Sequence, residues 1–368
     1  MKRRVIAAML LLSVLLGGCS GWMEGHYVSV EPHTEEGYQN NMEITEVTNY
    51  LQLRNALTSI VQSGRESSVI SMASYGGSDV VEDMEAAIRY IRERLPIGAY
   101  AVDWIKYELG TTVGIPAVAL TVGYNHNRAE IGQIRQVEDM EDAEAVVHSA
   151  LRLCQPSVVM QISNYRTNAD YALMVEKYAA SHPNKVMEIP QVTVNVYPQT
   201  GSVRVVELVF TYQTDRNSLR SMQNYSESIF DSAALYVSAE DEQHVEFEQM
   251  YSFLMERNDY KLETSITPTY SLLRHGVGDS KAFALVYSAM CRQAGLECLV
   301  VSGTKEGEPW FWNIICIDGV YRHVDLLQLH TSGGFYPRTD DQMDGYVWDY
   351  SSYPVCEAII EEEIDDSQ

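Results

Sequence analysis

The sequence lacks any pair of cysteines at the spacing of a metal-binding or redox motif. Its six cysteines form no CxxC pair and no cysteine–histidine ligand pattern, so neither a metal site nor a cofactor is expected. One of them, Cys19, lies near the start of the chain, and the other five are an odd number. We expect these five to be buried free thiols. One or two disulfides are the alternative, which secretion would permit.

Positive charge is also scarce. The chain has 26 lysines and arginines against 51 aspartates and glutamates, which gives a net charge of −25. A surface with this excess repels phosphate backbones, so nucleic acid is not expected as a partner. The acidic ending, residues 357–368, is interpreted as a solvated tail.

Long apolar runs are absent except at the N-terminus, where one extends from Val5 to Leu16. This run is too short to cross a bilayer, and the cations before it are typical of a secretory signal. Its ending, LGGC, resembles a bacterial lipoprotein signal, which implies a lipid on Cys19; a plain signal peptide is the alternative. We therefore expect a lipoprotein signal peptide over 1–18 and a tether over 19–44. The protein would be extracytoplasmic and lipid-anchored to a bacterial membrane through Cys19.

Residues 45–213 alternate between helical and strand periodicity, and the alternation occurs twice. Each time the order is helix, strand, helix, strand, strand. The stretches SSVISMASY and PSVVMQISNY supply the first of these strands in the two halves. We predict a duplicated α/β unit with copies at 45–125 and 137–213. A chance similarity between two α/β segments is the alternative, and neither copy contains residues that suggest catalysis.

The remaining chain is expected to form connecting helices over 214–259 and an α+β domain over 260–356. In this last domain an amphipathic helix begins at Ser280, after a glycine-rich turn. Three β-rich stretches follow, CLVVSGT, PWFWNIICIDG and YRHVDLL. The last two are joined by an Asp-Gly turn, which is a strong hairpin signal.

Four stretches in this domain, GDSKAFA, GLECLVVSG, WFWN and YRHVD, resemble the motifs of bacterial transglutaminase-like proteins in order and spacing. These proteins are a branch of the papain-like cysteine enzymes, and the ending FYPRTDDQMDGYVWDYSSYPVC is similar to that of their secreted members. The resemblance implies a papain-like fold and a Cys–His–Asp triad, in which a thiolate attacks a carboxamide. Position by position, the triad falls on Ser280, Trp310 and Asp325, so that only the aspartate is retained.

The two replacements predict loss of catalysis. A serine hydroxyl needs a base more than a thiol does, and an indole offers only an N–H donor. His323 is the alternative base for Ser280, since it would share a strand face with Asp325. However, two residues along a strand separate side chains by about 7 Å, which is too far for the carboxylate to orient the ring directly. His275 and His330 lie in flanking loops and are less suited to this role.

Trp310 and Trp312 are expected on one face of their strand, where they could form an aromatic binding shelf for a sugar or a peptide. A place in the core is the alternative. The sequence thus predicts an α+β, non-catalytic transglutaminase-like lipoprotein of the bacterial cell envelope. It would bind or scaffold, with a cell-wall peptide, a glycan or a protein as the partner. A hydrolase or amidase that uses Ser280 with His323 is the alternative function, and a purely structural envelope module is a third.

Overall fold

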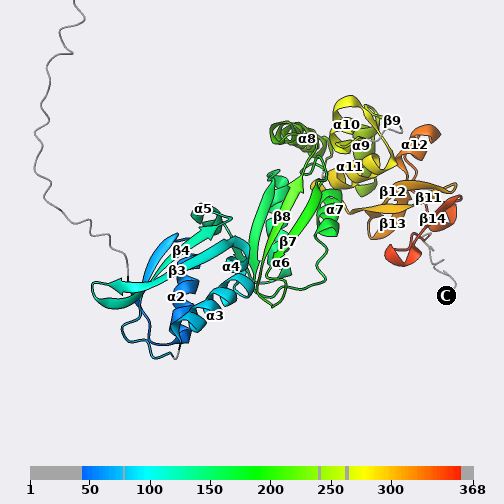
Figure 1. Ribbon diagram of the computed structural model, residues 1–368. Coiled ribbons are helices and arrows are strands. Elements are labelled where there is room, and N and C mark those ends of the chain that lie inside the picture. Colours follow the sequence, from blue (N-terminus) through cyan, green and yellow to red (C-terminus); the bar gives the residue numbers. More distant parts are fainter. Residues whose placement is uncertain (1–43, 78, 239–241, 262–264, 358–368) are drawn as a thin grey trace, which may run out of the picture. The chain divides into compact units, whose positions relative to one another are not determined.

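The computed structural model describes residues 44–77, 79–238, 242–261 and 265–357 (Figure 1). Cys19, the signal peptide, the tether up to residue 43 and the acidic tail from residue 358 lie outside these residues. Nearly all described residues fall into one compact unit, Glu46–Gln368. None of the helices in the described ranges combines the length and the apolar character needed to cross a lipid bilayer.

The first α/β unit contains a sheet with the strand order β1-β2-β4-β3. Its elements are β1 (Thr45–Glu46), α2 (Tyr50–Gln62), β2 (Ser67–Ser71), α3 (Val80–Glu93), α4 (Pro96–Ala101), β3 (Val102–Thr112) and β4 (Ile115–Tyr124). The helices bury one apolar face against the sheet, as Leu53, Ile91 and Val118 are fully enclosed in one core. The stretch AYAVDWIKYEL begins as helix and continues as strand. Pro96 stands at the first turn of α4, where proline favours a helix start, and the strand begins only at Val102.

The second α/β unit contains a sheet with the strand order β5-β6-β8-β7. The short helix α5 (Arg128–Gly132) precedes it and packs Ile131 into the core of the first unit. The elements of the second unit are β5 (Arg135–Val137), α6 (Met140–Arg152), β6 (Ser157–Ile162), α7 (Tyr171–Ser181), β7 (Gln191–Tyr197) and β8 (Arg204–Thr211). The order of strands is the same as in the first sheet, and the pairs β2–β4 and β6–β8 are both antiparallel. A duplication requires this agreement in topology, and the duplication itself stays a prediction.

The C-terminal part contains an antiparallel sheet with the strand order β13-β12-β11-β14. Before the sheet come α8 (Arg216–Tyr236), α9 (Gln243–Met255), β9 (Asp259–Tyr260), α10 (Pro268–His275), β10 (Val277–Gly278) and α11 (Ser280–Gln293). The sheet and its additions are β11 (Cys298–Lys305), β12 (Glu308–Ile317), β13 (Val320–Val324), α12 (Leu326–Ser332), η1 (Asp340–Gln342), β14 (Tyr346–Trp348) and η2 (Tyr350–Ser352). The observed architecture is a mixed α+β fold, as the sequence predicts.

Helices α8 and α9 are more than the connection that was expected over 214–259. Phe230 of α8 and Phe247 of α9 are fully buried in the same core as Phe283 and Val286 of α11. The core of the last domain therefore begins before residue 260. An amphipathic sequence shows that a helix has an apolar face, but it does not show which surface that face will meet.

The five described cysteines are all free thiols. Cys154, Cys291, Cys298 and Cys356 are buried, and Cys316 is half-buried. Burial raises the pKa of the Cys291 thiol well above its usual value, because a thiolate would lose its hydration there. Such a thiol behaves as a small apolar group rather than as a nucleophile.

Candidate active site

Ser280 stands at the start of α11, directly after the glycine-rich turn. Gly276 ends α10 with φ of 72°, a left-handed backbone that glycine adopts without strain. Asp279 then caps α11, since its carboxylate accepts the N–H of Ala282 at 2.8 Å. Ser280 is only 7% exposed, and its Oγ accepts the backbone N–H of Phe311 at 3.3 Å. The turn therefore places Ser280 inside the domain, against β12.

Asn313, from the WFWN stretch, fixes β12 relative to α11. Its Nδ2 donates to the carbonyl oxygens of Ala284 at 2.9 Å and of Leu299 at 3.1 Å. The residue is fully buried, and its Oδ1 has no partner among the described residues. This asparagine therefore has a clear structural role: it ties the helix that begins with Ser280 to two neighbouring strands.

Trp310 lies on β12 at the position that the resemblance assigns to the catalytic histidine. Its Nε1–H donates to Oδ2 of Asp325 at 3.0 Å. The indole therefore makes the same kind of contact with the carboxylate that an imidazole would make, but it has no lone pair with which to accept a proton. The ring is half-buried, and the ammonium of Lys305 lies 5.0 Å from its centroid.

Asp325 is buried, and both of its carboxylate oxygens are engaged. Oδ1 caps α12 by accepting two backbone N–H groups of its first turn. Oδ2 accepts from Trp310, from the Lys305 ammonium at 3.1 Å and from the Tyr346 hydroxyl at 2.5 Å. Burial and the nearby carboxylate raise the pKa of Tyr346, so its hydroxyl remains a donor. The carboxylate thus joins an indole, an ammonium and a phenol, and it has no imidazole to orient.

Lys305 and Tyr346 were not singled out from the sequence, although they contact Asp325 directly. Each lies about twenty residues from it along the chain, in β11 and β14. No local motif marks either residue. Only the order of strands in the sheet brings them together with Asp325.

His323 is held away from Ser280 by two other partners. Its Nδ1 accepts the Nε1–H of Trp312 at 2.9 Å, and its Nε2 lies 2.8 Å from Oδ1 of Asp340. Because Nδ1 accepts, a neutral ring carries its proton on Nε2 and donates it to Asp340. Burial lowers the pKa of His323, although the Asp340 carboxylate opposes this shift. Both ring nitrogens are therefore occupied, and the structure does not favour His323 as a base for Ser280.

The expected strand face shared by His323 and Asp325 is not formed. The strand β13 ends at Val324, and Asp325 is already the cap of the following helix. An aspartate at this position accepts helical N–H groups, so the backbone leaves the strand there. His275 and His330, expected in flanking loops, lie in α10 and α12.

Trp312 does not belong to an exposed binding shelf. It is 1% exposed and packs edge-to-face against Tyr346 and Trp348, with centroid distances of 5.2 and 5.7 Å. A Cβ at Gly303, on the neighbouring strand, would come within 2.8 Å of the Trp312 ring. The shelf was a wrong expectation for Trp312, because the side chains of Tyr346 and Trp348, from β14, pack against its ring. Trp310 alone of the pair is partly exposed.

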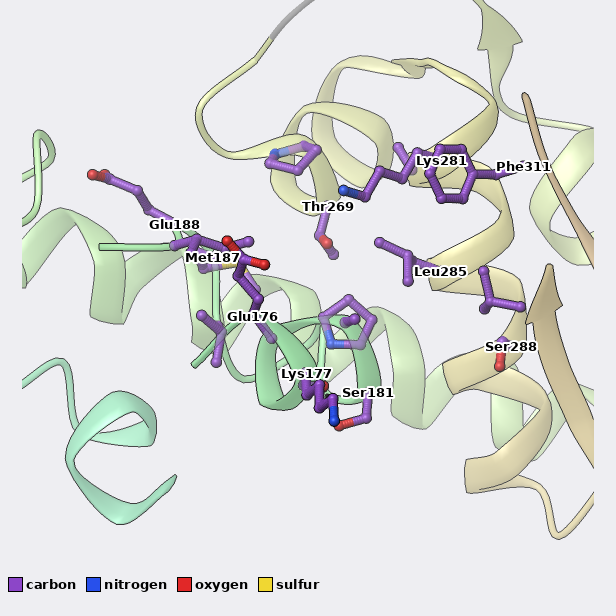
Figure 2. A pocket seen from close by; sticks show the side chains of 18 of the residues that line it. Glu176, Lys177, Ser181, Met187, Glu188, Thr269, Lys281, Leu285, Ser288 and Phe311 are labelled. Carbon is purple, nitrogen blue, oxygen red and sulfur yellow. Dashed lines mark hydrogen bonds between the residues drawn. The ribbon is translucent and has the colours of Figure 1, made fainter. Parts of the chain in front are cut away.

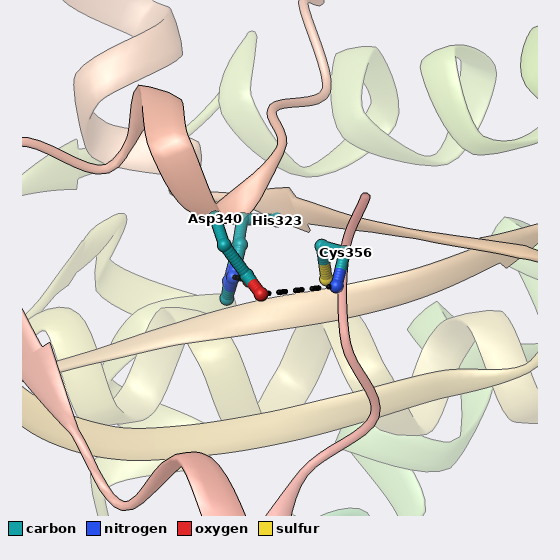
Figure 3. A group of neighbouring side chains, drawn as sticks. All are labelled: His323, Asp340 and Cys356. Atoms are coloured by element: carbon teal, nitrogen blue, oxygen red, sulfur yellow. Dashed lines mark hydrogen bonds and ion pairs between the residues drawn. The ribbon is translucent and has the colours of Figure 1, made fainter. Parts of the chain in front are cut away.

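A cluster of His323, Asp340 and Cys356 has the residue types of a metal site (Figure 3). Their ligand atoms all lie within 4.8 Å of one another. However, His323 Nε2 donates to Asp340 while its other nitrogen accepts from Trp312, so the neutral ring has no free lone pair. Burial, with the Asp340 charge, raises the pKa of Cys356 to about 12. These protonation states fit a hydrogen-bonded cluster better than a set of metal ligands.

A match to a known family covers the part of the chain that contains Ser280, Trp310 and Asp325. A family model of the transglutaminase-like superfamily matches residues 233–348. The C-terminal part of this chain is a transglutaminase-like domain. The match begins within α8 and includes α9, which agrees with the shared core of these helices with α11. Residues 45–213, for which a duplication is predicted, lie outside the match.

Solved structures and curated sequences add little to this assignment. A crystallised TGase is 9% identical, with a TM-score of 0.28 over 67% of this chain and 68% of that chain. A candidate cysteine protease from Cytophaga hutchinsonii is 14% identical, with a TM-score of 0.25 over 45% of this chain and 70% of its own. A candidate protease from Parabacteroides distasonis is 9% identical, with a TM-score of 0.23 over 70% of this chain and 39% of its own. No curated protein sequence matches the chain.

Proposed function

We propose that this protein is a non-catalytic member of its superfamily, whose transglutaminase-like domain serves binding or scaffolding. The observation that carries the proposal is the hydrogen bond from Trp310 to Asp325 at 3.0 Å. The resemblance assigns the catalytic base to position 310, and an indole has no lone pair with which to act as a base, which supports the proposal. General acid–base catalysis contributes about 10²–10⁴ in rate, and a hydroxyl nucleophile depends on it more than a thiol does.

The other nitrogen bases near this group are already engaged. The Lys305 ammonium is ion-paired with Asp325 at 3.1 Å, and a protonated amine cannot accept a proton from Ser280. His323 makes hydrogen bonds with Trp312 and Asp340. Ser280 itself accepts the N–H of Phe311. A hydrolase or amidase that uses Ser280 with His323 is therefore the less supported function.

The absence of turnover is a direct prediction. The wild-type protein should show neither transamidation nor amidase or peptidase activity on broad substrate panels, and a fluorophosphonate probe should not label Ser280. Mass spectrometry of the probe-treated protein should give the same result for wild type and for Ser280→Ala. Ser288→Ala, a buried serine of the same helix, serves as the matched control. Labelling of Ser280 that disappears in His323→Ala would establish the rival mechanism.

We further infer that the protein acts on the outside of a bacterial membrane, anchored by lipid on Cys19. The LGGC ending of a short apolar run supports this placement. A cell-wall peptide, a glycan or another envelope protein is then the accessible partner.

Cells fed a fatty-acid analogue should incorporate the label into the wild type and not into Cys19→Ala, because Cys19 is the acceptor. Cys316→Ala is the control, since Cys316 is the least buried of the described cysteines. The readout is in-gel fluorescence after click reaction, together with the membrane and soluble fractions. Equal labelling of wild type and Cys19→Ala would disprove the anchor.

A further inference from the structure

A half-open cavity of about 920 Å³ lies beside the start of α11 (Figure 2). One wall comes from α7 and the segment that follows it, and the other from α10, α11, β11 and Phe311. Asp279 and Lys281 line this cavity, whereas Ser280, Trp310 and Asp325 do not. The cavity is therefore separate from the triad-equivalent residues. Its volume lies in the upper part of the range of about 300–1,000 Å³ that is typical of ligand pockets.

The lining is more apolar than polar, and its apolar side chains are mainly aliphatic. Leu285 of α11, Met187 after α7 and Val300 of β11 are examples from its different sides. Phe311 is the single aromatic side chain among the lining residues, and the ammonium of Lys281 lies 5.4 Å from its ring centroid. A sugar would need an open aromatic face for stacking, and the Lys281 ammonium lies over one face of this ring. The cavity is better suited to aliphatic groups of a ligand.

Most of the polar groups in the lining are used within the protein. The Glu188 carboxylate accepts the backbone N–H groups of Gln213 and Thr214. The Ser288 hydroxyl donates to the carbonyl oxygen of Cys298, and the Arg292 guanidinium donates to that of Ser181 at 2.6 Å. These hydrogen bonds hold the walls together, and the Arg292 guanidinium uses its Nε and Nη2 groups in them.

Glu176 of α7 and Lys281 of α11 differ from them. Both side chains are exposed, and apart from the contact of Lys281 with Phe311 neither makes an ion pair or a side-chain hydrogen bond within the described ranges. Figure 2 shows them on opposite sides of the cavity. Lys177, next to Glu176, also lines the cavity without such a partner. A carboxylate and an ammonium thus face one apolar space from different walls. A ligand that complements them carries a cation and an anion at separate ends, with aliphatic groups between.

We propose that this cavity binds a short aliphatic peptide with free termini. Glu176 faces the α-ammonium of the peptide, Lys281 faces its α-carboxylate, and the aliphatic side chains pack on Leu285 and Met187. A fatty acid supplies the apolar part but only one charge, and so leaves Glu176 without a counterpart. The proposal deepens the proposed function and rests on it in one respect: the bound peptide is not cleaved.

The probe is a pool of unmodified tetrapeptides built from alanine, valine and leucine, followed by the best binder alone. Binding is measured by NMR chemical-shift changes and by calorimetry on the full-length protein. We expect Lys281→Met and Glu176→Gln each to weaken the best binder about tenfold, the size of one charge-assisted hydrogen bond. Lys106→Met and Glu93→Gln are matched controls. Lys106 also lies over an aromatic ring, that of Trp104, and Glu93 is an exposed helical glutamate. Both residues lie outside the cavity, and neither variant should change the affinity.

Peptides with one blocked terminus show which residue contacts each end of the peptide. C-terminal amidation should weaken binding to the wild type about tenfold and have no further effect in Lys281→Met; N-acetylation should behave in the same way with Glu176→Gln. Four results would overturn the proposal. The first two are the absence of binding by any peptide of the pool and an equal effect of amidation in wild type and Lys281→Met. The other two are a peptide affinity that depends on Lys177 in place of Lys281, and binding of dodecanoate that is independent of Glu176. Cleavage of a bound peptide would refute the proposed function and leave the site intact. Absence of both binding and cleavage would refute the site alone.

Discussion

Replacing Asp325 by alanine should lower the free energy of unfolding by about 3–5 kcal/mol, the cost of removing one partner of a buried ion pair. The carboxylate is buried, whereas its partner Lys305 is about one-fifth exposed, so the ion pair alone accounts for only part of this loss. The rest comes from the cap of α12 and from the buried Tyr346 hydroxyl, which would lose its acceptor. Urea denaturation followed by circular dichroism gives the measurement.

Asp215→Ala is the matched control for this experiment. Asp215 caps α8 in the same way, by accepting two backbone N–H groups, but it is exposed and has no buried partners. Its removal should cost about 1 kcal/mol, the typical contribution of an N-cap. If the two variants were destabilised equally, the contacts of Asp325 with Trp310, Lys305 and Tyr346 would contribute nothing to stability. The carboxylate would then have to be retained for another reason, such as chemistry.

Trp312→Ala should destabilise the protein by about 3–5 kcal/mol, as is typical of a large aromatic side chain removed from a core. Trp312 is 1% exposed and is enclosed by Tyr346 and Trp348. Trp312→Phe keeps most of the apolar volume but removes the N–H that Nδ1 of His323 accepts. Leaving this buried nitrogen without a donor should cost about 1–3 kcal/mol. Thermal and urea unfolding of the two variants separate the packing contribution from the hydrogen bond.

Trp104→Ala provides the comparison for Trp312. Trp104 lies on β3 with 38% of its surface exposed, so its removal should have a much smaller effect. Equal destabilisation of the two alanine variants would mean that Trp312 is not enclosed in solution. In that case an aromatic surface formed by Trp310 and Trp312 would again be a candidate binding site.

Local signals in the sequence were sufficient for several elements of the site. The start of α11 at Ser280 follows from a capping aspartate and a glycine turn, both of which act within a few residues. The hairpin between β12 and β13 follows from its Asp-Gly turn, where Asp318 and Gly319 both have positive φ. The family match at 233–348 also agrees with the motifs GDSKAFA, WFWN and YRHVD.

Contacts between distant segments decided what local signals could not. The alternation in β12 places Trp310 and Trp312 on one face, but only the pairing of β14 with β11 determines that Trp312 is covered. The identity of His323 does not show whether it is a base or a core residue. Its hydrogen bonds with Asp340 and Trp312 make it a core residue. The covering of Trp312 by β14 and the contact of His323 with Asp340 both come from the segment after α12. A residue's own sequence neighbours carry no information about which distant chain will cover it.

The sequence by itself determined the α+β class and the place of Ser280 at a helix start, because these depend on local backbone preferences. The tertiary structure decided the role of Asp325. Its oxygens accept from Trp310, Lys305 and Tyr346, which come from three different strands. It also decided that α9 belongs to the last core and that a cavity forms beside α11. Burial and hydrogen bonding depend on which surfaces meet, and that is fixed only when the whole chain has packed.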